Sequence, residues 1–190
     1  MARAYYATQT QRTLNFGELP SLSHNLESYR AYQWKVEIAL PTGGEGEEIL
    51  TLAAKQVSQI AFTSEDIVAD RVNDKFYYPG KVAPEELTIT FDNLVKGDVA
   101  QKLFDWMSNT YDPIQGVFTP NFIQGNGGFK TNIKIFYLDN TMFPVKHVYL
   151  YGAYPKAWKL AEFNYTTNEF HTIEVAVRYD FAVQYNGLDG

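Results

Sequence analysis

The sequence lacks cysteine: none occurs in its 190 residues. This absence excludes disulfide bonds, thiolate metal sites and a cysteine nucleophile. The chain also has no run of about 18 apolar residues, the length that a membrane-spanning helix requires. Its first residues, MARAYYATQTQR, lack the apolar core of a signal peptide. We therefore expect no membrane segment, and a chain made in the cytosol fits this composition.

Residues that carry enzyme chemistry are equally sparse. The three histidines, His24, His147 and His171, are far apart and show no metal-ligand spacing such as HExxH. The sequence contains no G-x-S-x-G nucleophile elbow. We predict no catalytic residue, no cofactor and no metal site, and hence not an enzyme. A glycosidase-like pair of carboxylates stays open, because sequence does not give the distance between two side chains.

The charge balance is acidic, with a formal net charge of −6. Tight DNA binding requires clustered Lys and Arg against the phosphates, so this chain is not expected to wrap DNA. The same charge suits a surface that DNA must pass without sticking. Hydrophobic residues make up 45%, enough for one domain with a core, and aromatic residues make up 16%, which favours strands and contact surfaces.

Alternation of apolar and polar residues predicts most of the secondary structure as strands. The clearest run has apolar residues at Ile173, Val175, Val177, Tyr179, Phe181 and Val183. The same period predicts strands at 32–40, 87–91 and 131–138, and apolar runs predict shorter ones at 49–57 and 148–151. Gly152 and Pro155 then predict a bend. The expected fold class is mainly β, a β-sandwich or barrel-like domain with one α-helix.

The helix is predicted at 98–109. Val99, Leu103 and Trp106 fall on one stripe, and Asp98 can cap the first turn. We interpret Leu103 and Trp106 as the side chains that dock the helix onto the sheet. The alternative for Trp106 is a stacking platform for a base or sugar.

Two loops could suggest ligand sites. Glu45, Glu47 and Glu48 follow a glycine pair, but they lack the pattern of an EF-hand loop, so a solvated turn is preferred over a calcium site. The GNGG run at 125–128 lies in a loop predicted over 111–129. It lacks the Lys and Ser/Thr of a phosphate-binding loop, which favours a flexible insertion.

The segment 56–80 has neither a helical nor a strand period. Its apolar residues, Ile60, Phe62, Ile67, Val68, Val72 and Phe76, are scattered among the acidic residues Glu65, Asp66, Asp70 and Asp74. A chain going out and back over this length makes two arms of about 10 residues, each roughly 33 Å long. Such a hairpin is marginal alone and exposes two unpaired edges, which invite pairing with another chain.

Three groups of residues resemble the tail tube protein family of contractile (myovirus) bacteriophages. The first lies near the C-terminus and comprises Gly152, Pro155, Asn168, Glu169, Thr172, Ile173, Glu174 and Val175. The second lies on the predicted helix and comprises Asp98, Gln101, Lys102, Asp105, Trp106 and Ser108. A weaker third is the alternation of Trp34, Val36 and Ile38. Together they touch most of residues 30–183, and their order and spacing are fairly specific.

The resemblance implies a domain organisation and a function. It implies an N-terminal arm at 1–30, a tail tube β-sandwich domain at 31–185 and a C-terminal tail at 186–190. The long hairpin at 56–80 would pair with neighbouring copies in an intersubunit barrel. Hexameric rings would stack into a hollow conduit for DNA inside a contractile sheath, with a tape-measure protein filling the bore first.

Further expectations concern the bore and the location. Glu65, Asp66, Asp70 and Asp74 are the suspected lumen-facing residues, because like charge repels phosphate. The protein would be part of the virion, assembled in the host cytoplasm. Two alternatives stay open: a tube-initiator or secretion or injection-system tube protein of the same fold, or a carbohydrate- or ligand-binding β-sandwich with Trp34, Trp106 and Trp158 as platforms.

Overall fold

The computed structural model describes residues 29–41, 46–112, 114–118, 128–166 and 168–186. The chain divides into two units, residues 1–33 and 34–190. In the described part of the first unit, the Arg30 guanidinium donates to the Tyr32 hydroxyl at 2.8 Å. The predicted arm at 1–30 lies almost wholly outside the described residues, as does the tail beyond 186. The following paragraphs concern the second unit.

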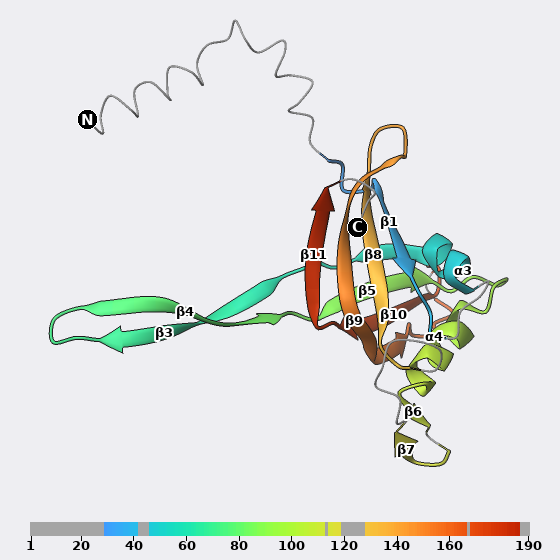
Figure 1. The fold of residues 1–190 in the computed structure, drawn as a ribbon. Helices are drawn as coiled ribbons and strands as arrows, with labels where there is room; N and C mark the ends of the chain where they lie inside the picture. Colours follow the sequence, from blue (N-terminus) through green and yellow to red (C-terminus); the bar gives the residue numbers. More distant parts are fainter. Residues whose placement is uncertain (1–28, 42–45, 113, 119–127, 167, 187–190) are drawn as a thin grey trace, which may run out of the picture. The chain divides into compact units, whose positions relative to one another are not determined.

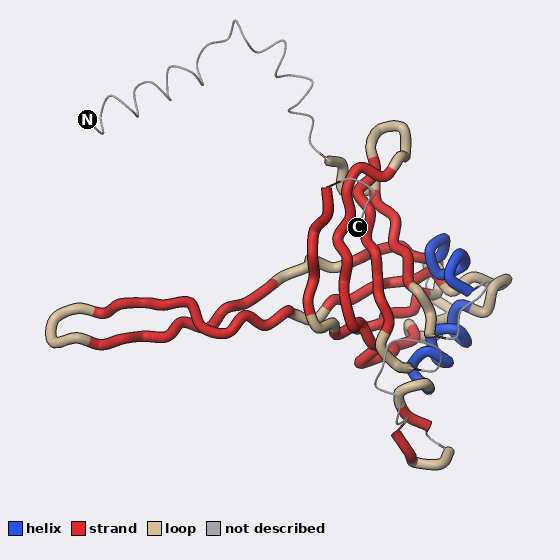
Figure 2. Tube along the Cα trace, viewed as in Figure 1, coloured by secondary structure: helices blue, strands red, loops and turns tan. Residues whose placement is uncertain are grey.

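Two antiparallel sheets form the sandwich of this unit (Figure 1). Sheet A consists of β1 (Trp34–Ile38), β8 (Thr131–Leu138), the first half of β9 (Pro144–Leu160) and β11 (Phe181–Asn186). Sheet B consists of the second half of β9, β10 (Thr172–Arg178), β5 (Leu87–Asp92) and β2 (Ala54–Val57). The long strand β9 belongs to both sheets. The prediction of a mainly β sandwich is confirmed, and Figure 2 shows strands forming most of the described chain.

The core lies between the inner faces of the two sheets. Strand residues point alternately to opposite faces, so each strand contributes every second side chain. Sheet A contributes Val36, Ile38, Ile133, Ile135, Val148 and Leu150, and sheet B contributes Leu87, Ile89, Phe91, Ile173, Val175 and Val177. Each of these side chains is almost fully buried. Their burial is the main favourable term for folding this unit.

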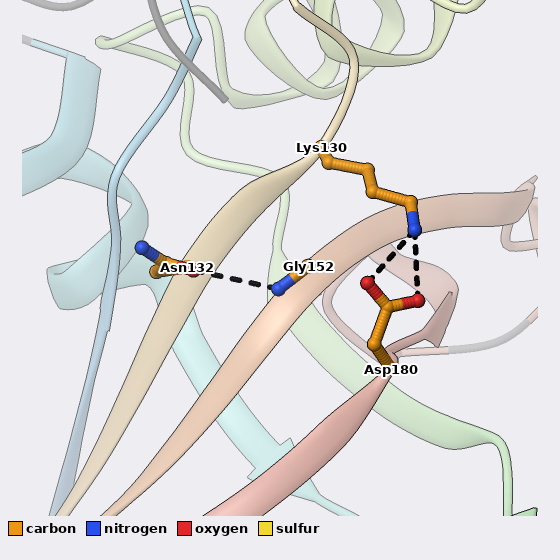
Figure 3. A network of polar contacts seen from close by, with 4 residues as sticks. All are labelled: Lys130, Asn132, Gly152 and Asp180. Carbon is orange, nitrogen blue, oxygen red and sulfur yellow. Dashed lines mark hydrogen bonds and ion pairs between the residues drawn. The ribbon is translucent and has the colours of Figure 1, made fainter. Parts of the chain in front are cut away.

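A glycine inside β9 allows the strand to pass from one sheet to the other. Gly152 has a φ of +63°, and a Cβ there would lie 2.1 Å from Oδ2 of Asp180. Figure 3 shows Asp180 beside this glycine, with the Lys130 ammonium donating to both carboxylate oxygens at 2.8 Å. The Gly152 amide donates to Oδ1 of Asn132 at 3.4 Å. The predicted short strand and bend are therefore one continuous strand with a corner in it.

The long C-terminal alternation is also divided. It predicts one strand through 173–183, but β10 ends at Arg178 and β11 begins at Phe181. β10 pairs with β5 and β9 in sheet B, whereas β11 pairs with β9 in sheet A. Because the chain changes sheets between them, Phe181 and Val183 are exposed, not buried. The prediction of one half-buried strand was wrong at this point.

Helix α4 (Val99–Ser108) occupies the predicted position. Leu103 and Trp106 are each 1% exposed and belong to the core. The expected capping by Asp98 was wrong, because this residue is left-handed, with φ 48° and ψ 44°, and its side chain makes no capping hydrogen bond. Its carbonyl still accepts from the Lys102 amide at 2.9 Å, which begins the helical ladder.

A second helix replaces part of a predicted strand. The segment 49–57 was expected to be extended, but α3 covers Gly46–Ala53 and only Ala54–Val57 forms β2. Leu50 and Ala53 are buried three residues apart, which matches the period of a helix. Glu47 and Glu48 lie in the first turn, where negative charge is favoured by the helix dipole. The single predicted helix is therefore one of two in the described residues, neither of them long and apolar enough to cross a membrane.

The structure describes only part of each of the two loops that were considered as ligand sites, the acidic run at 45–48 and the loop at 111–129. Of the acidic run, Glu47 accepts from the Leu40 amide at 3.1 Å, Glu48 is exposed, and Glu45 lies outside the described residues. Within the described ranges, no group of three His, Asp or Glu residues could hold a metal ion. The loop at 111–129 contains a two-residue pairing of β6 (Tyr111–Asp112) with β7 (Val117–Phe118). Of GNGG, only Gly128 is described.

Candidate intersubunit hairpin

The ambiguous segment forms a long antiparallel hairpin of β3 (Phe62–Asp70) and β4 (Lys75–Pro84). The two strands pair only with each other in the described structure, so each has one unpaired edge. Nearly every residue of both strands is exposed, and Figure 1 shows the hairpin extending away from the sheets. The hairpin runs from 62 to 84 where the sequence predicted 56–80, because residues 54–57 belong to sheet B.

The hairpin continues the edge of sheet B. β2 leads into β3 and β4 leads into β5, while β2 and β5 are themselves paired. Between the two pairings, the Ser58 amide donates to the Thr88 carbonyl at 2.8 Å and the Glu85 amide donates to the Ala61 carbonyl at 2.9 Å. The hydroxyl of Ser58 also accepts from the Thr88 amide at 2.9 Å. The base of the hairpin is therefore hydrogen-bonded through to the core sheet.

Tyr179 packs against this base. Its side chain is buried, its hydroxyl donates to the Ala61 carbonyl at 3.5 Å, and its ring meets Phe62 edge-on with centroids 6.5 Å apart. Burial raises the pKa of the Tyr179 hydroxyl, and the nearby Glu85 carboxylate raises it further. With its hydroxyl protonated, the Tyr179 side chain thus helps to hold the first residues of β3 against the sandwich.

We expect alkaline pH to loosen the hairpin base through Tyr179. Since the pKa is higher in the folded state, this group's contribution to stability is present below about pH 10, the pKa of a free tyrosine. It is lost as the pH rises through the folded value. Tyr179→Phe should remove a late-titrating group from the tyrosinate absorbance curve and leave the fold intact. An unchanged curve in this variant would contradict the assignment.

A bulge interrupts the hairpin about one third of the way along it. The pairing shifts register between Ser64 and Asp66, opposite Gly80. A Cβ at Gly80 would lie 2.3 Å from the carbonyl oxygen of Glu65, so only glycine permits this approach of the two strands. Bulges increase the local twist of a ribbon. Gly80 therefore sets the direction of the outer part of the hairpin.

Beyond the bulge, the register divides the hairpin into two chemically different faces. Residues directly opposite each other share a face. Ile67 opposite Tyr78 and Ala69 opposite Phe76 form one face, which we call the apolar hairpin face. Along β3, Glu65 alternates onto this same face. The other, the charged hairpin face, comprises Asp66, Val68, Asp70, Lys75 and Tyr77.

This division separates residues that the sequence grouped together. Of the suspected lumen-facing set, Asp66 and Asp70 share the charged face, Glu65 lies on the apolar face, and Asp74 lies in the turn. Asp70 pairs with Lys75 at 3.5 Å, which reduces the negative charge of that face.

The predicted apolar hairpin residues also divide. Ile67 and Phe76 share the apolar face, Val68 and Phe62 alternate onto the opposite one, and Val72 is fully exposed in the turn. Ile60 precedes β3 and packs against the core. Its assignment to the hairpin was wrong, because the chain leaves the sandwich only after it.

The outer face of sheet A is a second exposed surface, which sequence analysis missed. We call it the aromatic face; it comprises Lys35, Glu37, Lys134, Phe136, Tyr149, Tyr151, Phe181, Val183 and Tyr185, together with His147, which is only 1% exposed. Its aromatic rings contact one another in a row. The Tyr151 ring stacks on that of Phe181 with ring centres 4.6 Å apart, and its centre lies 4.2 Å from that of Tyr149. The hydroxyls of Tyr151 and Tyr185 are hydrogen-bonded at 2.9 Å, which raises the pKa of Tyr151 to about 12.

Lysine side chains accompany these rings. The Lys134 ammonium lies 5.2 Å from the centre of the Tyr149 ring, and Lys35 lies 5.9 Å from that of Phe136. Lys35 also pairs with Glu37 at 2.5 Å. Beside them a groove of about 600 Å³ runs between the sheet and α3. Leu52, 81% exposed, lines it from the helix side. The lining also includes Glu37, Glu47 and Glu48, so charges of both signs accompany the aromatic rings.

The outer face of sheet B is polar by comparison. Its paired residues include Thr90 opposite Glu174 and Thr88 opposite Ala176. Ion pairs lie along it, with Lys55 3.1 Å from Asp92 and Lys156 beside Glu86. The Lys156 ammonium holds the pKa of Glu86 below its usual value. This face therefore carries small side chains and charges of both signs, as is typical of a solvated surface.

The tryptophans do not form a sugar platform. Trp106 is buried in the core, while Trp34 and Trp158 are half-buried and pack against it. Trp158 contacts Phe104 edge-on at 5.8 Å. None of the three is among the exposed large side chains of the described residues, so their placement does not favour the carbohydrate-binding alternative.

Comparison with solved structures places this arrangement among known folds. A chain of the anti-feeding prophage baseplate matches with a TM-score of 0.64 and 11% identity, over 84% of this chain and 97% of that one. A chain of the PVC sheath/tube terminator, from an extracellular contractile injection system, matches with a TM-score of 0.63 and 19% identity, over 84% and 97%. The SPP1 tail tube matches with a TM-score of 0.55 and 12% identity, over 85% and 81%.

This chain has the tail tube fold. No family model matches its sequence, and no curated protein does. At 11–19% identity the likeness concerns the backbone, so the tail tube fold is shared while the side chains differ. The resemblance that the sequence suggested through the C-terminal strand and the helix is confirmed at the level of the fold.

Proposed function

We propose that this protein is the structural subunit of a hollow tube: copies associate into rings, six to a ring, and the rings stack inside a contractile sheath. The observation that carries the proposal is the β3–β4 hairpin. Ile67, Phe76 and Tyr78 are each about half exposed on one face of it. Monomeric proteins rarely leave such a face uncovered together with two unpaired edges. Association with further copies would cover both.

The tail tube fold supports this proposal over other self-assembling architectures. The matched chains come from structures described as a baseplate, a sheath/tube terminator and a tail tube, and the baseplate structure is six-fold symmetrised. A tube-initiator or terminator role, or a tube of an injection system, would use the same surfaces. None of these roles needs a catalytic centre, so we do not expect enzyme activity.

The charged hairpin face and the outer face of sheet B are the two surfaces we propose for the wall of the conduit. Both carry charges of either sign without a cluster of Lys or Arg, and the charged hairpin face also carries Val68 and Tyr77. A wall of this kind does not bind phosphates tightly, so DNA would pass without specific binding. A tape-measure protein would occupy the same bore before DNA, and the sheath would contact the outside of the tube. The tube would be part of a phage tail or related particle, assembled in the host cytoplasm.

Negative-stain microscopy of the purified chain tests the proposal. We expect hollow rings or stacked tubes, whereas a monodisperse monomer of about 22 kDa at high concentration would contradict it. A matched variant replaces residues 64–82 with Asn-Gly, which closes the hairpin beside the Thr63–Ala83 pair. This variant should keep its β circular dichroism and form no rings. Loss of the whole fold instead would show that the hairpin belongs to the monomer core.

A further inference from the structure

We infer that the apolar hairpin face of one copy docks on the aromatic face of sheet A of another copy. The inference rests on the proposed self-assembly and names the two surfaces that meet. Both surfaces are exposed on the same chain: Ile67 is 59% exposed and Tyr78 54% exposed on the hairpin, and Phe181 is 52% exposed on sheet A. Neither β3 nor β4 pairs with any strand of sheet A in the described structure.

The shapes of the two surfaces fit this arrangement. The hairpin is a two-stranded ribbon whose apolar face carries side chains of medium and large size. The aromatic face is a row of contacting rings bordered by the groove beside α3, which Lys134 and Tyr149 help to line. Aromatic side chains that bury large areas in such contacts dominate the energetics of protein interfaces. A ribbon lying across the rings would cover Tyr149, Tyr151 and Phe181 together.

Glu65 and Lys134 offer one pair of opposite charges between the two surfaces. Glu65 shares the apolar hairpin face with Ile67 and makes no ion pair with any described residue. On the aromatic face, Lys134 lies over the Tyr149 ring and forms no ion pair with a described carboxylate; its cross-strand neighbour Glu37 pairs with Lys35 instead. Docking would bring one acidic and one basic side chain into a partly dehydrated contact, where opposite charges fix the register of the interface.

Cysteine cross-linking tests the contact directly, because the natural chain contains no cysteine. Tyr78→Cys on the hairpin and Val183→Cys on sheet A, mixed as separate single variants under oxidising conditions, should give a disulfide-linked dimer. The matched control is Tyr77→Cys. Tyr77 is next to Tyr78 in sequence, but its side chain lies on the charged hairpin face. It should cross-link to Val183→Cys at least 10-fold less. Equal cross-linking from both hairpin positions, or none from Tyr78→Cys, would overturn the inference.

A charge exchange tests the pairing of Glu65 with Lys134. Glu65→Lys and Lys134→Glu should each raise the protein concentration needed for half-maximal assembly about 10-fold in sedimentation velocity. The double variant should return it to within about 3-fold of the natural chain. Additive losses in the double variant would overturn the inference.

The outcomes also separate this contact from the tube itself. Rings seen by microscopy without Tyr78–Val183 cross-links would leave the proposed function standing and remove only the docking. A cysteine could also be placed within residues 1–28. If it cross-linked to Val183→Cys more than Tyr78→Cys does, the N-terminal segment would be the occupant of the aromatic face, and the inference would be overturned. A chain that stays monomeric would remove both.

Discussion

Replacing Trp106 with alanine is expected to lower the free energy of unfolding by about 3–5 kcal/mol. The indole is 1% exposed and lies with Val99 and Leu103 in the core beneath α4. Its removal loses the buried apolar area and leaves a cavity that the surrounding strands fill only in part. Urea denaturation of the subunit with residues 64–82 replaced, which should not assemble, gives this quantity without a contribution from ring contacts.

Two matched variants on the same helix define the mechanism. Phe104→Ala removes a ring that is 42% exposed, so the loss should be clearly smaller than for Trp106. Trp106→Phe should also be mild, because Nε1 of Trp106 is buried without a hydrogen-bond partner in the described structure, and phenylalanine removes that donor. A Trp106→Ala loss below about 1 kcal/mol would mean that the indole is not the anchor of α4.

Gly152→Ala is the second substitution with a large expected effect, a loss of about 3 kcal/mol. Two causes act together. The residue has a φ of +63°, which a side chain disfavours, and the new Cβ would lie 2.1 Å from Oδ2 of Asp180. The collision would also displace Asp180 from Lys130 (Figure 3). Because β9 changes sheets at this residue, the damage should reach both sheets.

A double variant separates the two causes. Asp180→Ala alone breaks an exposed ion pair and should cost no more than about 1 kcal/mol. In Gly152→Ala/Asp180→Ala the carboxylate is gone, so the collision is relieved and only the backbone strain remains. The double variant should therefore be more stable than Gly152→Ala. If the two losses simply add, the close approach of Asp180 is not what requires glycine at this position.

The two helices show where local pattern is sufficient and where it is not. The stripe of Val99, Leu103 and Trp106 predicts α4 because one buried face over three turns is unambiguous. α3 is only eight residues long, and the apolar run at 49–57 is compatible with either a strand or a buried helix. Sequence could not separate these, since the choice depends on packing against β1 and α4.

The same reasoning explains why the sequence predicted a single strand through 173–183 and why it missed the aromatic face. Alternation continues through Tyr179 into Phe181 and Val183, so it predicts one strand with one buried face. Which sheet a strand joins is decided by its hydrogen-bonding partner, and that partner changes between β10 and β11. The aromatic face was missed for this reason. Its residues lie on four strands, and only their pairing brings them together.

By itself, the sequence determined that this is a mainly β domain with one docked helix, no cysteine chemistry and one long segment without a core-forming pattern. These properties follow from local periodicity and composition, which every stretch of chain carries within itself. Only the tertiary structure decided where β9 turns its corner, which hairpin residues share a face, and that Ile60 stays with the core. Those features depend on strand register and on close approaches such as Gly152 to Asp180, and both arise between residues far apart in sequence.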